Sequence, residues 1–512
     1  MATTVNTSSG RIARHGTRLR LAGALFATAS TQALAQSTVI EPGIEARFVA
    51  TTNANAGVTG AAPARDVILE VRPNLYLRSR GAGLTVDGSV GLTASHYQQG
   101  AQRSRILPDG RLDLNAAIVE RTLFVDAGFS SFRTSINPFG PQSEFGSTNT
   151  SSTSVYRLSP YLERSLTPTL SALARTDVQA THGFGDEAAT SAARNSRTLR
   201  NTARLEQRPV PVGAKAEFSS EKTTYSSSGV TPLDTRTARV MLTAAPTTEL
   251  EIGIFAGKER TATPLETRSD PTRGGFFDWR PTSRTSLTTE FGKRYFGNDW
   301  DASFRHRLPG FAIALASSRT LTSSPLQTTG EALPGLLDSM LTTRIPNVDD
   351  RAAAVRDLIN SLGLPPGTLQ GIELFGQQAL IEQRNSASLA WNNQRNTLSL
   401  TGFYARNEAL PTALLAGLDA GQSRQHGAQL DFARRLDAEW SGNLGAARTQ
   451  LNGLGNTLGA VTKQTTFRLD LIYNSSRRSA VTLGLRRNLF DSNVPLESSN
   501  ETAAFAGVRM RF

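Results

Sequence analysis

Arginine is the residue type in this sequence whose placement offers most for chemistry. Lysine and arginine together number 55 against 43 aspartate and glutamate residues, which gives a formal net charge of +12. The arginines lie singly within segments of alternating polarity and do not form blocks, and this argues against a nucleic-acid partner. Arginines that line a pore favour anions. The first chemistry that the sequence suggests is therefore electrostatic selection of an anionic solute or sugar polymer.

The other reactive residue types form no catalytic or metal-binding pattern. The five histidines are scattered without the pairing that metal sites use: His15, His96, His182, His306 and His426. The sequence has no cysteine, no Walker A loop and no Gly-x-Ser-x-Gly elbow. Asp349 and Asp350 fit a helix N-terminus better than a calcium site. We therefore predict no enzyme, no cofactor and no metal, although Ser, His and Asp assembled from separate strands would escape a search by spacing.

Strands must position the arginines, and residues 502–512 show the sequence pattern of such a strand. Between Thr502 and Phe512 an apolar face that includes Phe512 alternates with a face that carries Arg509 and Arg511. A period of two indicates a half-buried strand, and about ten residues suffice to cross a bilayer. A strand that ends the chain on an aromatic residue resembles the last strand of bacterial outer-membrane β-barrels. In those proteins it is the assembly signal, and we expect Phe512 to serve as one. The alternative is a soluble edge strand.

The same alternation predicts which side chains face the inside of a barrel. A charge that faces lipid near the bilayer midplane costs about 2–4 kcal/mol, so charged residues belong on the inner face. The predicted lumen-lining residues are Arg305, Arg307, Arg468, Arg486, Arg509 and Arg511. The alternative is that arginines and acidic residues pair across the lumen as structural ladders.

Connections of two lengths organise the rest of the chain. Residues 1–35 have a basic start, an apolar stretch and an Ala33-Leu34-Ala35 cleavage site, which predicts a signal peptide before a barrel at 36–512. Short Pro- and Gly-containing turns then alternate with longer polar loops, of which 259–273 is one. The alternation predicts an all-β, antiparallel transmembrane barrel of about 22 strands in the outer membrane of a Gram-negative bacterium. An even number places both termini on the periplasmic side.

One long loop has helical character. In the segment 332–382, leucines recur at helical spacing after Leu333, and a second apolar stripe runs from Asp350 to Leu362. Asn347 or Asp349 can cap this second helix. We expect the pair to plug the barrel mouth, to cap it or to hold a partner. The alternative is a hairpin that packs only on itself at the surface.

Five stretches give the chain a family resemblance. They are Ser135-Ile-Asn-Pro-Phe-Gly-Pro-Gln142, Ser154-Val-Tyr-Arg-Leu-Ser-Pro-Tyr161, Phe291-Gly-Lys-Arg-Tyr-Phe-Gly297, Trp300-Asp-Ala-Ser-Phe-Arg-His306, and Ile345-Pro followed by Arg351-Ala-Ala-Ala-Val. With them the chain resembles the outer-membrane proteins associated with the PEP-CTERM/exosortase sorting system of bacteria that make exopolysaccharide. The resemblance implies a barrel and a setting in the cell, and it implies no site residues.

The leading functional hypothesis is a channel or export component with an arginine-containing lumen. Its expected partners are outer-membrane lipid and lipopolysaccharide, the outer-membrane assembly machinery, and exopolysaccharide or PEP-CTERM proteins. The alternative is a non-conducting docking barrel that presents its loops to envelope polysaccharide or sorted proteins. An outer-membrane enzyme is the third hypothesis.

Overall fold

The computed structural model describes most of the chain. It describes residues 37–512 apart from 57–61, 136–138, 142–148, 185–194, 227–231, 263–265, 323–332, 343, 363–379, 410–421, 477 and 495–497. The predicted signal peptide, 1–35, lies outside the described residues.

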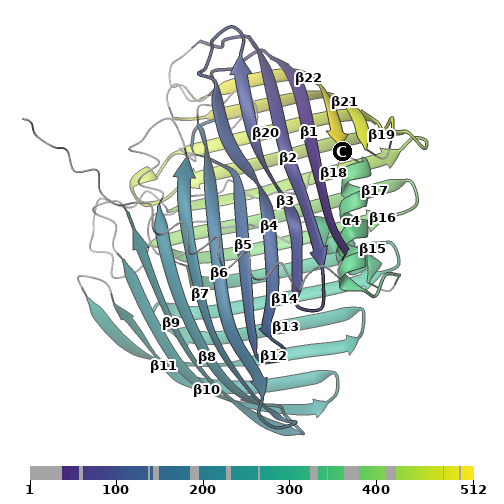
Figure 1. Cartoon of the computed structure of the whole chain (residues 1–512). Helices are drawn as coiled ribbons and strands as arrows, with labels where there is room; N and C mark the ends of the chain where they lie inside the picture. The colour runs from purple at the N-terminus through teal and green to yellow at the C-terminus, as the bar shows by residue number, and fades with distance from the viewer. Residues whose placement is uncertain are drawn as a thin grey trace, which may run out of the picture.

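In the described part, 22 strands form one antiparallel sheet that closes on itself. β1 pairs with β2 on one side and with β22 on the other, and Figure 1 shows the resulting barrel with β1 and β22 adjacent. The predicted fold and strand number are thereby confirmed.

The strands are 10–16 residues long. The first half of the barrel is β1 Ser37–Thr51, β2 Asp66–Arg80, β3 Leu84–Tyr97, β4 Arg105–Val119, β5 Leu123–Ser135, β6 Thr150–Ser165, β7 Leu170–Phe184, β8 Ser196–Gln207, β9 Val212–Tyr225, β10 Leu233–Thr247 and β11 Leu250–Ala262. The second half is β12 Thr267–Thr282, β13 Thr285–Arg294, β14 Gly297–Leu308, β15 Phe311–Thr322, β16 Leu380–Asn392, β17 Asn396–Ala409, β18 Ser423–Arg435, β19 Trp440–Gly453, β20 Val461–Tyr473, β21 Ser479–Ser492 and β22 Ser499–Arg511. A 3₁₀ turn, η1 Gly455–Thr457, follows β19.

Two helices, α3 Leu333–Leu341 and α4 Val348–Leu362, interrupt the strand series between β15 and β16. Asn347 caps α4, because its side-chain oxygen accepts the backbone N–H of Asp350 at 3.1 Å. The predicted insertion at 332–382 was too long at its far end, since residues 380–382 already pair with β17 as strand. No described helix is long and apolar enough to span a membrane.

Short connections alternate with longer ones around most of the barrel, as predicted, but the three successive connections from β12 to β15 are only two residues each. The connection between β14 and β15 is residues 309–310, whereas β15 and β16 are separated by residues 323–379. The prediction of a long loop at 259–273 was wrong, because β11 runs to Ala262 and β12 starts at Thr267. The polar residues there remain in the ladder and form ion pairs, such as Arg268 with Asp270 at 2.6 Å.

The two faces of the sheet differ in chemistry. Large apolar side chains on the outer face are exposed, for example Phe48 at 60% and Ile106 at 68%. The neighbour Val49 points inward and is 0% exposed. Directly paired residues share a face in an antiparallel ladder, so the pairing register extends this assignment to every strand. Both Ser37 and Arg511 lie at the end of the barrel that carries the short connections.

Candidate functional site

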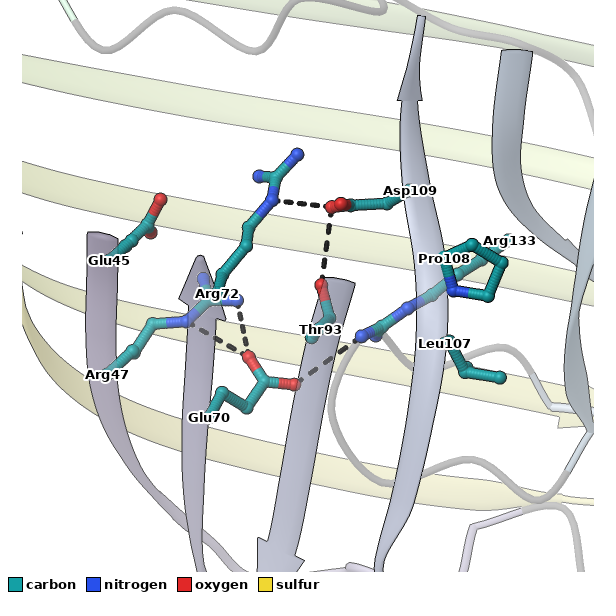
Figure 2. Close-up of a pocket in the computed structure, with 9 residues that line it drawn as sticks. All are labelled: Glu45, Arg47, Glu70, Arg72, Thr93, Leu107, Pro108, Asp109 and Arg133. Atoms are coloured by element: carbon teal, nitrogen blue, oxygen red, sulfur yellow. Dashed lines mark hydrogen bonds and ion pairs between the residues drawn. The ribbon is translucent and has the colours of Figure 1, made fainter. Parts of the chain in front are cut away.

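The lumen wall formed by β1–β5 carries a compact network of charges. Glu70 is 4% exposed and accepts Arg47 at 2.6 Å, Ser95 at 3.3 Å and Arg133 at 3.5 Å. Figure 2 shows Glu70 between the two arginines at the edge of a cavity of about 250 Å³.

The upper part of this cavity has its own ion pair. Arg72 lies 2.5 Å from Asp109, which also accepts the Thr93 hydroxyl at 3.2 Å (Figure 2). The cavity lining contains three arginines and three acidic residues: Arg47, Arg72, Arg133, Glu45, Glu70 and Asp109. This side of the lumen is therefore a charge-balanced ladder of the kind that the alternative interpretation predicted.

Two of the predicted lumen arginines also lie in such ladders. Arg468 contacts Asp470 at 2.6 Å on β20, and Arg486 contacts Glu501 at 2.9 Å between β21 and β22. Arg486 and Glu501 are only 6% and 2% exposed. Buried charges of this kind are kept where each has its partner. Both arginines face inward, where they help to hold the wall together.

The helical insertion lies inside the lumen and crosses it. On one side, four alanines on the inner face pack against α3 and α4, and they are Ala312, Ala314, Ala390 and Ala433. The apolar stripes predicted from the sequence make this contact through Leu336, Leu337, Val355 and Ile359, each 7% exposed or less. Small wall residues let the helices approach the sheet closely.

Ion pairs hold α4 to β2 and β3, further around the same side of the barrel. Arg356 lies 2.9 Å from Asp87 on β3, and Asp350 lies 2.8 Å from Arg80 on β2. The Arg356 guanidinium also lies over the Tyr76 ring at 5.0 Å. Only four of the 22 strands, β20, β21, β22 and β1, separate these two groups of contacts, so α4 lies as a short chord across one side of the lumen.

This chord lies at the short-connection end of the barrel. Ala312 is two residues from the 309–310 turn, and Ala390 is close to the 393–395 turn. In Figure 1, α4 lies beside the end of the last strand. The insertion leaves the sheet at Thr322 and re-enters it at Leu380, at the opposite end. The sequence placed the helices in an outer loop, and the structure places them across the far mouth.

Four of the predicted lumen arginines gather at the same mouth. Arg305 and Arg307 face inward from β14, on the same face as Ala314 and Ala312, with which they pair directly. Arg509 and Arg511 face inward from β22, where Arg509 pairs directly with Glu45. Arg307 donates to the Ser339 carbonyl of α3 at 3.1 Å.

Positive charge is crowded around the helices at this end. Burial lowers the pKa of the Arg356 guanidinium most, Asp357 opposes that shift, and the nearby charge of Arg511 adds to it. Among the described residues, a cavity of about 350 Å³ between α3 and β12–β15 is lined by four arginines, Arg280, Arg284, Arg305 and Arg307, and by no acidic residue.

The four described histidines lie on four different strands, β3, β7, β14 and β18. His96 bonds Ser104 at 2.9 Å and His306 bonds Thr285 at 2.8 Å, each on a different part of the barrel. His15 lies outside the described residues. Among the described residues, no group of three or more His, Cys, Asp and Glu side chains is placed to hold a metal ion.

Sequence reasoning missed the contacts that position α4, namely Arg80, Asp87 and Arg356. Their signal was partly present, because Asp87 and Arg80 each fall on the charged face of an alternating segment. The alanines on inner faces next to short turns were a second signal, since a small inner face leaves room for another element. Pairing between distant segments was the missing information.

Known proteins resemble the chain at the level of the barrel. The family described as "Putative beta-barrel porin 2" matches residues 383–512. No curated protein matches the sequence. The FrpB iron transporter from Neisseria meningitidis (F3-3 variant) has a TM-score of 0.48 and 7% identity over 92% of this chain and 82% of that chain.

Two further solved structures give the same picture. The siderophore receptor PirA from Acinetobacter baumannii has a TM-score of 0.46 and 8% identity over 92% of this chain and 80% of that one. The copper transporter OprC has a TM-score of 0.42 and 10% identity over 92% and 81%. These likenesses carry no argument about substrate. The closed ladder, together with the porin family that matches residues 383–512, gives the fold of an outer-membrane β-barrel.

Proposed function

We propose that the protein is an outer-membrane channel whose bore is narrowed by α3 and α4 and whose narrow mouth favours anions. The observation that carries this proposal is the position of α4, which lies as a chord across one side of the lumen between Ala433 on β18 and Asp87 on β3. Barrels of about 22 strands are wide enough to need an internal plug. A helix pair that fills only part of the lumen leaves a restricted path beside it.

The charge pattern supports the anion preference. In the described part of the chain, three acidic residues balance three arginines in the cavity along β1–β5, whereas the cavity under α3 is lined by four arginines and no acidic residue. Rings of arginine and lysine favour anions at a constriction. A solute that passes the helices therefore meets excess positive charge at the narrowest place.

Conductance across planar bilayers tests the proposal. Wild-type protein should give small anion-favouring currents, and a variant with a Gly-Ser linker in place of residues 333–362 should give larger ones. The variant Ala504→Leu, whose side chain faces lipid, is the control for the effects of mutation and purification. Absence of current from both the wild type and the linker variant would reject the channel. It would favour the non-conducting docking barrel, which is also compatible with an ion-paired lumen that holds two helices.

We further propose that the channel serves the PEP-CTERM and exopolysaccharide system, with both termini in the periplasm and no enzymatic activity. The support for this setting is the sequence resemblance alone. The expected partners are outer-membrane lipid and lipopolysaccharide, the assembly machinery, and exopolysaccharide or sorted proteins. A strain without the protein should retain polysaccharide or sorted proteins in its periplasm. Unchanged export would reject the setting without affecting the channel.

A further inference from the structure

We propose that the outer face of β10–β12 carries a binding site for the phosphates of lipopolysaccharide, the phosphorylated glycolipid of the outer leaflet. The site is a group of exposed basic side chains, the outer basic patch, which consists of Arg236, Lys258, Arg260 and Arg273. This inference deepens the expected partnership with lipopolysaccharide. It rests on the proposed orientation, in which the short connections face the periplasm, and it does not depend on conduction.

The pairing register places the outer basic patch on the outward face of the barrel. In β10, Val240 is 58% exposed on the outer face, and Arg236 lies four residues before it. Arg236 is paired directly with Arg260 of β11, and Lys258 lies two residues before Arg260. Arg273 of β12 lies two residues from the direct partner of Lys258. Residues two apart in a strand point to the same face, and direct partners share a face, so all four side chains point outward.

The patch lies at the upper edge of the apolar band, toward the end of the barrel that carries the longer connections. β11 starts at Leu250, after the short connection 248–249, and its outward face continues through Ile252, Ile254 and Ala256 to Lys258. At roughly 3.4 Å per residue and a tilt of about 40°, Lys258 lies about 20 Å above Leu250, and the apolar band of such barrels is about 25 Å tall. Long basic side chains at this height reach the headgroups of the outer leaflet.

The chain itself balances little of the charge on this face. Arg236 and Arg260 are direct cross-strand partners, and like charges in that relation destabilise a sheet. Among the described residues, Asp234 is the only acidic residue on the outward faces of β9–β12. It contacts Arg236 at 3.2 Å and is paired directly with a fifth base, Lys222. An anion from outside the chain would therefore stabilise this face.

The rim of the barrel is low near the patch. The connection from β11 to β12 is residues 263–266, and the connection from β13 to β14 is residues 295–296. On another side of the barrel, residues 136–149 connect β5 to β6. The short connections leave space beside the patch for the sugar headgroup of a glycolipid.

The surroundings of the patch favour a lipid over a dissolved anion. Exposed apolar side chains lie below it on the same face, among them Val240, Leu242 and Ile254. Acyl chains cover such a face, so a phosphate that meets the patch belongs to a membrane lipid. Arginine forks match phosphate oxygens, and bases spread over three strands suit a headgroup with more than one phosphate. This favours lipopolysaccharide over a phospholipid, which carries a single phosphate.

Lipid binding to the whole protein, refolded in detergent without lipopolysaccharide, tests the site. Native mass spectrometry measures the fraction of barrels that hold a lipopolysaccharide with short sugar chains, its dephosphorylated form or phosphatidylglycerol. The double variant Arg260→Gln/Arg273→Gln should bind the phosphorylated lipopolysaccharide about tenfold or more weakly, because each base near an anionic membrane surface strengthens binding roughly fivefold.

The matched control is the double variant Arg164→Gln/Arg434→Gln. Both arginines are exposed on the outward face, but they lie at the short-connection ends of β6 and β18. The control removes the same charge from the other rim of the barrel, and it should bind within about twofold of wild type. A heat-dependent shift in gel mobility confirms that each variant has folded.

Three outcomes would overturn the site. They are equal binding of the dephosphorylated form or of phosphatidylglycerol, unchanged affinity in Arg260→Gln/Arg273→Gln, and an equal loss in the control. A dimer that only Arg260→Gln/Arg273→Gln loses would assign the patch to a second copy of the chain instead. Conductance in phospholipid bilayers separates this site from the channel, because currents without lipid binding reject only the site, and lipid binding without currents rejects only the channel.

Discussion

The guanidinium of Arg356 lies 2.9 Å from the carboxylate of Asp87, and this contact joins α4 to the wall opposite its apolar face. The two side chains are 269 residues apart in the sequence. The contact makes the helix a bridge between two groups of strands on one side of the barrel, and most of the behaviour expected of the channel depends on whether that bridge holds.

Arg356→Gln should loosen the bridge. The two side chains are 27% and 47% exposed, so their pairing contributes about 0.2–1 kcal/mol. Its loss should shift the ratio of docked to undocked helix by up to about fivefold. Single-channel recordings should show more frequent wide openings, and high salt should have the same effect on wild type. Arg200→Gln is the matched control, and an equal effect there would contradict the role of Arg356.

Ala390→Leu should displace the helices from the other side. Ala390 is 0% exposed beneath them, and a larger side chain in a packed contact costs about 1–3 kcal/mol. Conductance should move toward that of the linker variant, and proteases should cut within 333–362. Ala504→Leu adds the same atoms on the lipid face and should change neither. Wild-type conductance in Ala390→Leu would show that the alanine contact does not hold the helices.

Substitution of two different lumen arginines should affect two different properties, ion selectivity in one case and stability in the other. Arg305→Gln removes charge beside the constriction, and it should lower the anion preference measured by reversal potential in a salt gradient. Arg468→Gln removes equal charge but leaves Asp470, 3% exposed, without its 2.6 Å partner. It should mainly lower the midpoint of thermal unfolding. Equal selectivity losses in both variants would contradict a filter at the mouth.

Deletion of Phe512 should impair assembly more than stability. The side chain is 64% exposed on the outer face, and only its backbone N–H bonds the barrel, to Pro42 at 2.8 Å. Folded protein in the outer membrane should fall severalfold, while the purified chain should still refold in detergent. Membrane fractionation measures the first and circular dichroism the second. Normal levels of the deletion variant in the outer membrane would show that Phe512 is not an assembly signal.

The barrel was predictable because each strand repeats the same local rule. Alternation with a period of two and turns rich in Pro and Gly are local signals, and the phase read from Phe512 agrees with the outward position of Met510 in the ladder. Loop lengths were less predictable, since polar strand ends such as Arg268–Asp270 read as loop but continue the ladder beyond the apolar band.

The site was less predictable because its contacts join distant segments. Inward arginines can be read from alternation, but whether each meets an acid depends on register. Arg468 and Arg486 have acidic partners, whereas Arg307 donates to the backbone carbonyls of Ser283 and Ser339. The destination of α4 depends on Asp87 and Arg80, which no local pattern connects to it.

The bridge made by α4 also bears on the order of assembly. Its contacts fall on β18 and β19 on one side and on β2 and β3 on the other, and the seam where β1 meets β22 lies between them. A helix docked on both groups of strands draws together the two free edges of an unclosed sheet. It is also enclosed once those edges join. The helix that narrows the finished pore is thus placed to hold the two edges of the sheet together before the barrel closes.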